Sequence, residues 1–128
     1  MNPRSSSIRR VNHLAATVIV IALVTCGVLF AQSAEEGLAN FYSDKFQGKK
    51  MANGQTYDKN KLTASHKKHP FGTKLKVTNL DNGKSVVVTV TDRMGQKNPA
   101  VIDVTRRAAQ ELGFVKAGKA QVKVEPQQ

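Results

Sequence analysis

Two alternating runs on either side of a tight-turn sequence constrain the fold most strongly. Residues 74–80 (KLKVTNL) and 85–92 (SVVVTVTD) each place an apolar side chain at every second position, which is the pattern of a half-buried strand. Between them lies Asp81-Asn82-Gly83-Lys84. Asn and Gly tolerate the positive φ that a tight hairpin turn requires. We therefore predict an antiparallel hairpin over residues 74–92.

Other short segments continue the β pattern. Residues 37–43, 100–104 and 117–124 read as strands, whereas Thr105 can cap a short helix that runs through Leu112 and stops at Gly113. Five or six short strands with one helix in so small a domain predict a mainly β fold, a compact β-barrel.

The first third of the chain has a different composition. Residues 1–13 carry three arginines and no acid, residues 14–31 are almost wholly apolar, and a small-residue stretch ends at Ala34. This order is typical of a secretory signal. An uncleaved membrane anchor is an alternative, and lipidation of Cys26 is another. We predict a signal peptide or membrane anchor over 1–34 and a folded domain over 35–125, exported to the periplasm or cell envelope.

The predicted domain is strongly basic. The chain has 20 Lys and Arg against 9 Asp and Glu, and removing Arg4, Arg9 and Arg10 leaves 17 against 9, a net charge of +8. Such a charge suits an anionic partner, namely a wall polymer, lipid headgroups or nucleic acid, although it also simply promotes solubility. Few aromatic residues and the export signal argue against nucleic acid. The domain contains no cysteine, so packing alone must hold it together.

Titratable side chains are concentrated in the polar stretch 52–73. It contains Asp58, His66 and His69, and Asp92 ends the best-defined strand nearby. Asp and His can together supply general acid and base groups. The structural alternatives are that Asp58 is a turn residue and His66 a buried, hydrogen-bonded histidine.

A metal site is not predicted from the His66-x-x-His69 pair. A site needs three or four ligands, the domain has no thiols, and Lys67-Lys68 would repel a cation. Arg106 and Arg107 lie in the first helical turn, where the helix dipole disfavours cations, a mild indication of an anionic ligand.

The order and spacing of motifs over residues 37–124 resemble the rare lipoprotein A family, exported lytic transglycosylases with a double-psi β-barrel fold. The resemblance rests on GLA-x-FY (37–42), F-x-G-x-x-MANG (46–54), YD-x-x-x-LTA-x-HK (57–67), PFGT (70–73), VTNLDNGKSV (77–86), Asp92-Arg93, IDV (102–104), AA (108–109) and LG (112–113).

The resemblance implies cleavage of the bond between N-acetylmuramic acid and N-acetylglucosamine in peptidoglycan glycan strands, giving 1,6-anhydro ends. It implies a monomer without a cofactor, and septal targeting is not assumed. Asp58 would be the acid/base, Asp92 the partner that raises its pKa, and His66 an orienting group. We expect substrate contacts from seven further residues: Lys49, Lys50, Gln55, Tyr57, Lys67, Arg93 and Arg106.

Two departures from the family pattern stand out. Gln55 occupies a position where family members often carry Glu, and the segment 93–99 (RMGQKNP) departs from the family's glycine-rich form. The first departure favours an alternative function, a non-catalytic wall-binding barrel similar to expansins. A small exported inhibitor or partner of another wall enzyme is a third possibility.

Overall fold

The computed structural model describes residues 34–127. The predicted signal, the membrane anchor and the lipidation site Cys26 lie outside these residues. Within them, no helix has both the length and the apolar character needed to cross a membrane. The described elements are the strands β1 (Glu35–Phe41), β2 (Thr63–His66), β3 (Lys74–Asn79), β4 (Ser85–Arg93), β5 (Ile102–Val104) and β6 (Ala120–Pro126), the short 3-10 helix η1 (Asp44–Phe46) and the α-helix α2 (Arg106–Leu112).

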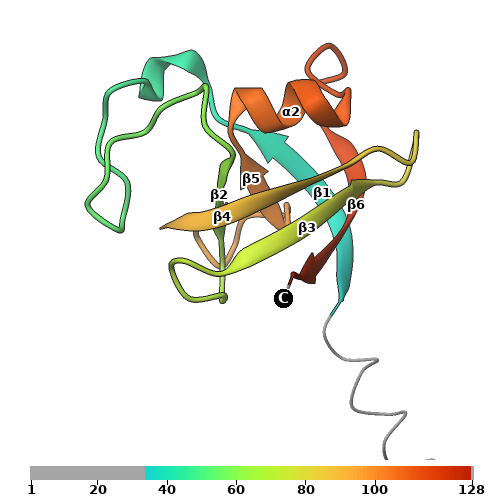
Figure 1. The fold of residues 1–128 in the computed structure, drawn as a ribbon, viewed down its shortest axis with the longest axis horizontal. Coiled ribbons are helices and arrows are strands. Elements are labelled where there is room, and N and C mark those ends of the chain that lie inside the picture. Colours follow the sequence, from blue (N-terminus) through green and yellow to red (C-terminus); the bar gives the residue numbers. More distant parts are fainter. Residues whose placement is uncertain (1–33, 128) are drawn as a thin grey trace, which may run out of the picture. The chain divides into compact units, whose positions relative to one another are not determined.

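The six strands close into a barrel in the order β1-β5-β2-β4-β3-β6 (Figure 1). The pairs β1–β5 and β2–β4 are parallel, and the other four pairs are antiparallel. Strands β3 and β4 form the predicted hairpin, with Leu75 opposite Val88 and Val77 opposite Val86. The prediction of a mainly β, six-stranded barrel with one short helix is confirmed.

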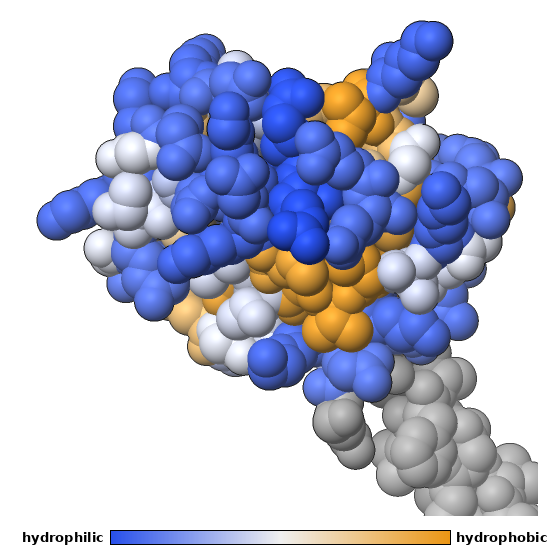
Figure 2. Space-filling view, turned by 45° about the horizontal axis from the view of Figure 1, so that its top comes forward, coloured by the Kyte–Doolittle hydropathy of each residue, from blue (hydrophilic) through white to orange (hydrophobic). Residues whose placement is uncertain are grey.

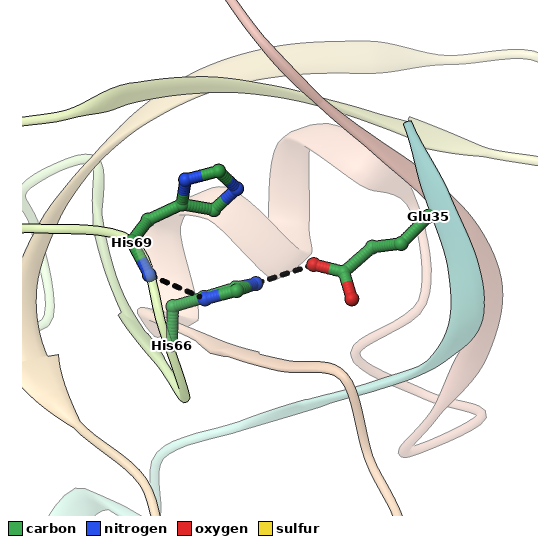
Figure 3. A group of neighbouring side chains, drawn as sticks. All are labelled: Glu35, His66 and His69. Atoms are coloured by element: carbon green, nitrogen blue, oxygen red, sulfur yellow. Dashed lines mark hydrogen bonds and ion pairs between the residues drawn. The ribbon is translucent and has the colours of Figure 1, made fainter. Parts of the chain in front are cut away.

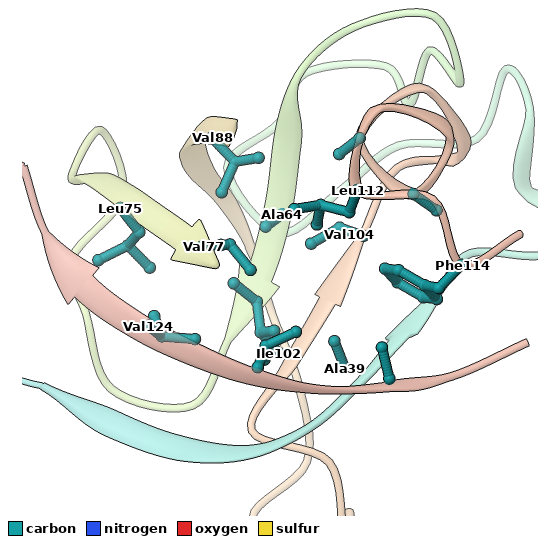
Figure 4. Close-up of a cluster of buried hydrophobic side chains, with 14 of the residues drawn as sticks. Ala39, Ala64, Leu75, Val77, Val88, Ile102, Val104, Leu112, Phe114 and Val124 are labelled. Carbon is teal, nitrogen blue, oxygen red and sulfur yellow. The ribbon is translucent and has the colours of Figure 1, made fainter. Parts of the chain in front are cut away.

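The barrel interior is filled by small and branched side chains from every strand (Figure 4). Leu75, Val77 and Val88 come from the hairpin, while Ile102 and Val104 come from β5, and all five are fully buried. Each alternates with a more exposed residue along its strand, which is the two-residue period expected of a barrel wall. The core described here contains no Lys or Arg side chain, so the excess positive charge lies outside it.

Helix α2 has the boundaries that its sequence predicts. Thr105 is the N-cap: its hydroxyl accepts the Ala108 N–H and donates to the Lys61 carbonyl at 2.5 Å. Gly113 ends the helix with φ +81°, in the left-handed region that favours glycine. Ala108, Ala109 and Leu112 face the core, so the helix covers one end of the barrel.

Strand β2 is the element that the sequence pattern did not predict. Its four residues, Thr63 to His66, lie in the polar stretch that reads as a loop. Only Ala64 joins the apolar core, and a single small side chain gives no visible alternation. Backbone pairing with β4 on one side and β5 on the other stabilises this strand, and such long-range pairing leaves no local signal.

Candidate active site

A row of polar side chains crosses four neighbouring strands on the outer face of the barrel. Asn40 on β1 is paired with Asp103 on β5, and Asp103 is paired with Ser65 on β2. Ser65 is in turn paired with Asp92 on β4. All four residues line one pocket of about 580 Å³. The alternation of each strand sends the neighbouring apolar residue, such as Ile102, into the core instead.

A bulge in β4 brings Asp92 onto this row. Ala64 is paired with Val90, but the next residue, Ser65, is paired with Asp92, so that Thr91 is an extra residue. Without it, the two-residue period would put Asp92 on the same face as Val90, which points into the core. Bulges of this kind re-aim side chains next to active sites.

Loops on both sides of the row form the walls of the pocket. One wall comes from the segment after β1 and η1, and the other from the segment after β4. The lining includes Tyr42, Phe46, Arg93, Met94 and Asn98. In the space-filling view the surface is largely hydrophilic and is interrupted by a hydrophobic area (Figure 2). The volume of the pocket lies in the range of small-molecule and cofactor sites.

Asp92 accepts three hydrogen bonds. Its Oδ2 accepts the Tyr42 hydroxyl at 2.5 Å, and its Oδ1 accepts the backbone N–H groups of Ala52 and Arg93 at 2.8 and 2.9 Å. An ionised carboxylate acts only as an acceptor, so this set of donors suits the charged form. The contacts also join β4 to the end of β1 and to the loop at Ala52.

Asp103 has the opposite environment. It is half-buried, and its Oδ1 is buried with no hydrogen-bond partner among the described residues. Burial raises the pKa of the Asp103 carboxyl above its ordinary value, and the charge of Asp92 raises it further. Two carboxyl groups thus share one pocket, one surrounded by hydrogen-bond donors and the other partly desolvated with a raised pKa. Carboxyl groups in contrasting environments are the arrangement that general acid–base chemistry uses.

Tyr42 connects Asp92 to a small group of aromatic rings. Its ring stacks on Tyr57 at a centroid distance of 4.6 Å and meets the ring of Phe46 edge-on at 5.8 Å. Burial raises the pKa of the Tyr42 hydroxyl, and the bond to Asp92 adds to this effect, so it remains a donor. Tyr57 stacks on Tyr42 and so supports its ring. Tyr57 itself is only 1% exposed and presents almost no surface to a ligand.

His66 lies in a second, smaller pocket, apart from the lining of the Asp92 pocket. Its Nδ1 accepts the backbone N–H groups of Lys68 and His69 at 3.0 and 3.1 Å, and its Nε2 contacts the carboxylate of Glu35 (Figure 3). Because Nδ1 accepts two hydrogen bonds, the ring proton of neutral His66 is on Nε2, which donates to Glu35.

Glu35, His66 and His69 bring three potential metal ligands within 4.8 Å of one another. The hydrogen bonds of His66 oppose a metal there, because binding through Nε2 would move the ring proton to Nδ1, where two backbone N–H groups already point. His69 is half-buried against His66, with ring centroids 4.6 Å apart. The chemistry of this group fits a hydrogen-bonded structural cluster better than a metal centre.

Asp58 and Gln55 line neither of the two pockets described here. The Asp58 carboxylate accepts the N–H of Asn60 at 2.9 Å, the geometry of a turn-forming aspartate. The Gln55 side chain is exposed and accepts a hydrogen bond from Asn53 at 3.1 Å. Of the three predicted catalytic residues, only Asp92 lies in the larger pocket.

The basic residues predicted to contact substrate occupy several environments. Lys49 and Lys50 are exposed on the loop after η1. Lys67 donates to the Asn98 carbonyl at 2.6 Å and lines the smaller pocket, whereas Arg106 pairs with Asp44 at 2.9 Å. Arg93 lines the larger pocket, but one of its terminal nitrogens donates to the carbonyls of His66 and His69 and so fixes the loop after β2.

Sequence reasoning missed Asp103, although it lies in the quoted motif Ile102-Asp103-Val104. A signal was present: an acid alternating with two apolar residues in a short strand must face outward where its neighbours face the core. Ser65 and Tyr42 were missed because their place in the pocket depends on strand register and on the bulge in β4.

The closed barrel with its outer row of polar side chains defines a double-psi β-barrel protein whose pocket contains two carboxyl groups. The model of the lytic transglycolase family matches residues 34–124, and the chain belongs to this family. The resemblance to rare lipoprotein A proteins is thereby confirmed.

Sequence relatives with assigned names support this family membership. The endolytic peptidoglycan transglycosylase RlpA of Neisseria meningitidis is 45% identical over 95 residues, covering 74% of this chain and 40% of that protein. The protein of the same name in Pseudomonas aeruginosa is 49% identical over 89 residues, covering 70% of this chain and 26% of that protein. The chain therefore spans less than half the length of these curated relatives.

Solved structures support the fold. The Streptomyces papain inhibitor superimposes with a TM-score of 0.61 at 18% identity, covering 76% of this chain and 96% of that one. The expansin of Clavibacter michiganensis superimposes with a TM-score of 0.59 at 22% identity, covering 74% and 50%. At these identities the likeness concerns the double-psi fold alone.

Proposed function

We propose that this protein is a lytic transglycosylase that cleaves peptidoglycan glycan strands between N-acetylmuramic acid and N-acetylglucosamine. The observation that carries the proposal is the pair of carboxyl groups in one pocket, Asp103 with a raised pKa and Asp92 with three donors. Relatives named endolytic peptidoglycan transglycosylases, at 45–49% identity, support the choice of substrate.

The proposed reaction has two proton transfers and consumes no water. Protonated Asp103 gives its proton to the oxygen that links the two sugars, and the bond from that oxygen to muramoyl C1 breaks. The muramoyl C6 hydroxyl then bonds to C1 and returns its proton to the Asp103 carboxylate. Ionised Asp92 stabilises the positive charge that develops on the muramoyl ring. The product is a 1,6-anhydro end, and Asp103 is again protonated.

Asp58 is the alternative acid, since it occupies the position that the family resemblance suggested. His66 would then act from the neighbouring pocket as an orienting group, through the loop that Arg93 joins to β4. We place Asp103 first because its carboxyl lines the same pocket as Asp92, whereas Asp58 bonds to its own turn.

Purified sacculi and mass analysis of the soluble products test the proposal. The wild-type protein should release fragments with 1,6-anhydro ends. Asp103→Asn should lower the rate by about a hundredfold or more, the usual range for loss of an acid–base group. Asp58→Asn should act like the wild type. Loss of activity in Asp58→Asn with full activity in Asp103→Asn would move the acid to Asp58, and absence of anhydro ends from the wild type would refute the enzyme.

The substrate sets where the protein works. We propose export to the periplasm or cell envelope, by a cleaved signal, an anchor or a lipid on Cys26, because peptidoglycan lies outside the cytoplasmic membrane. All residues of the proposed site come from one chain, so a monomer suffices. Light scattering of the purified protein checks its mass, and fatty-acid labelling of wild type and Cys26→Ser separates lipidation from the other routes.

A non-catalytic, expansin-like wall-binding barrel is the second candidate. Gln55 favours it, because an amide there cannot supply the carboxylate that family members often have. Under this alternative, wild type and Asp103→Asn would sediment equally well with sacculi and neither would release fragments.

A further inference from the structure

An exposed aromatic side chain forms part of the pocket wall next to the proposed catalytic pair. Phe46, at the end of η1, is 38% exposed and lines the pocket. Among residues 34–127 it is not part of the buried core; its ring meets the ring of Tyr42 edge-on, and the Tyr42 hydroxyl bonds to Asp92. Direct contacts therefore connect the exposed ring of Phe46, through Tyr42, to the carboxylate of Asp92.

The position of Phe46 is built by its neighbours. Ser43 caps η1, and Asp44 is held by Arg106 at 2.9 Å. Gly48 follows with φ +84°, and its N–H donates to the Tyr57 carbonyl at 3.1 Å, which returns the chain beside the aromatic group. These contacts fix the backbone on both sides of Phe46, so the fold holds its apolar ring at the surface.

Two lysines flank the same ring. The ammonium groups of Lys45 and Lys49 lie 5.4 and 5.9 Å from the centroid of Phe46. Among residues 34–127 neither pairs with a carboxylate within 4.0 Å, because the nearby Asp44 is taken by Arg106. Exposed cation–π contacts are weak, so a ligand can displace the lysines from the ring at little cost.

We infer that Phe46, Lys45 and Lys49 form a sugar subsite for an acidic pyranose. The positively polarised C–H groups on one face of the sugar ring lie against the negative face of Phe46. The lysines then turn from the ring to a carboxylate that the sugar carries on its substituent. This inference rests on the proposed function and adds to it the position that recognises the acidic sugar of the strand, the muramoyl residue with its lactyl or peptide carboxylate.

Binding of the full-length protein to two ligands tests the inference. The first is sacculi, which carry carboxylates, and the second is a chitin oligosaccharide, which carries none. Phe46→Ala should weaken binding to both about tenfold, and Phe46→Trp should restore it, because a larger ring keeps the stacking surface. The control Leu80→Ala removes a similarly exposed apolar side chain, 47% exposed, from the far hairpin and should leave both affinities unchanged.

The contribution of the two lysine charges is tested separately. Lys45→Gln combined with Lys49→Gln should weaken binding to sacculi about tenfold and leave chitin binding unchanged, since charged hydrogen bonds to a carboxylate are lost. The matched control replaces two exposed lysines of the β3–β4 hairpin, Lys74→Gln with Lys84→Gln, and should have no effect on either ligand.

The outcomes separate the two proposals. If the wild type cleaves sacculi and the folded Phe46→Ala variant binds both ligands like the wild type, the subsite is refuted and the enzyme stands. Equal losses in the two lysine pairs would refute recognition of the carboxylate at this position. If the wild type neither binds nor cleaves sacculi, the proposed function fails and the subsite with it. Unchanged circular dichroism and Tm show that each variant is folded.

Discussion

Asp92 and Asp103 are both paired in register with Ser65, one from each of the strands that flank β2. This places two carboxyl groups in one pocket in contrasting environments: Asp92 accepts three hydrogen bonds, whereas Asp103 is partly desolvated. The proposed acid–base mechanism assigns a different role to each of them.

Because the pKa of the Asp103 carboxyl is raised in the folded state, we expect ionisation of Asp103 to destabilise the folded protein. The folded state holds the proton more tightly than the unfolded chain, whose ordinary carboxyl pKa is 3.8. Stability is therefore lost as the pH rises from 3.8 through the folded-state pKa. We expect Asp103→Asn to raise Tm at pH 7, with a gain that shrinks as the pH falls to 4. Thermal unfolding at both values measures this effect, and an equal shift at both would mean that ionisation is not its cause.

Tyr42 and Tyr57 form a matched pair for testing the bond to Asp92. Tyr42→Phe removes a hydrogen bond to a charged group, worth about 1.5–3 kcal/mol, so the cleavage rate should fall about tenfold to a hundredfold. Tyr57→Phe removes a buried hydroxyl for which residues 34–127 offer no hydrogen-bond partner within 3.5 Å, and it should leave the rate within about twofold and stability unchanged or higher. Initial rates on sacculi and Tm values compare the two; equal loss of rate in the two variants would show that the hydrogen bond from Tyr42 to Asp92 has no special role.

The Gln55 position can be tested by restoring the carboxylate. Gln55 lies outside both pockets, on the loop whose Ala52 N–H bonds to Asp92, so a carboxylate there would reach the substrate where a bound glycan strand extends over this loop. We expect Gln55→Glu to raise the cleavage rate about tenfold or more, toward the range of an added acid–base group. Gln55→Asn is the control for altered packing. A rate unchanged by Gln55→Glu would remove this loop from the chemistry.

We expect His69 to make the folded protein less stable in acid. Burial lowers its pKa below 6.5, and His66 and Arg93 lower it further, although Glu35 opposes them. The unfolded chain then binds the proton more readily, so stability falls as the pH drops below 6.5. His69→Gln should therefore reduce the difference in Tm between pH 8 and pH 5. The same difference in variant and wild type would assign the acid sensitivity to other groups.

The parts of the fold that depend on local pattern follow from the sequence. The β3–β4 hairpin has alternation and an Asn-Gly turn, and α2 has a threonine cap and a glycine stop. Strand β2 has neither, because its pairing partners lie far away along the chain.

The site was harder to predict for the same reason. Asp92 could be named from the family motif, but alternation alone would turn it into the core, and only the extra residue Thr91 turns it outward. Asp103 needed the register of β5 against β2. Asp58 stands out in the sequence because it lies in a polar loop, yet its carboxylate bonds to its own turn, and its predicted catalytic role remains to be tested.

The most direct test of the mechanism is digestion of sacculi in water labelled with heavy oxygen, followed by mass analysis of the new muramoyl ends. Attack by the C6 hydroxyl predicts ends that lack one water relative to a hydrolysed product and carry no label, with their release lost in Asp103→Asn. Labelled, hydrated ends would show that water attacks C1, and would contradict the transglycosylase mechanism.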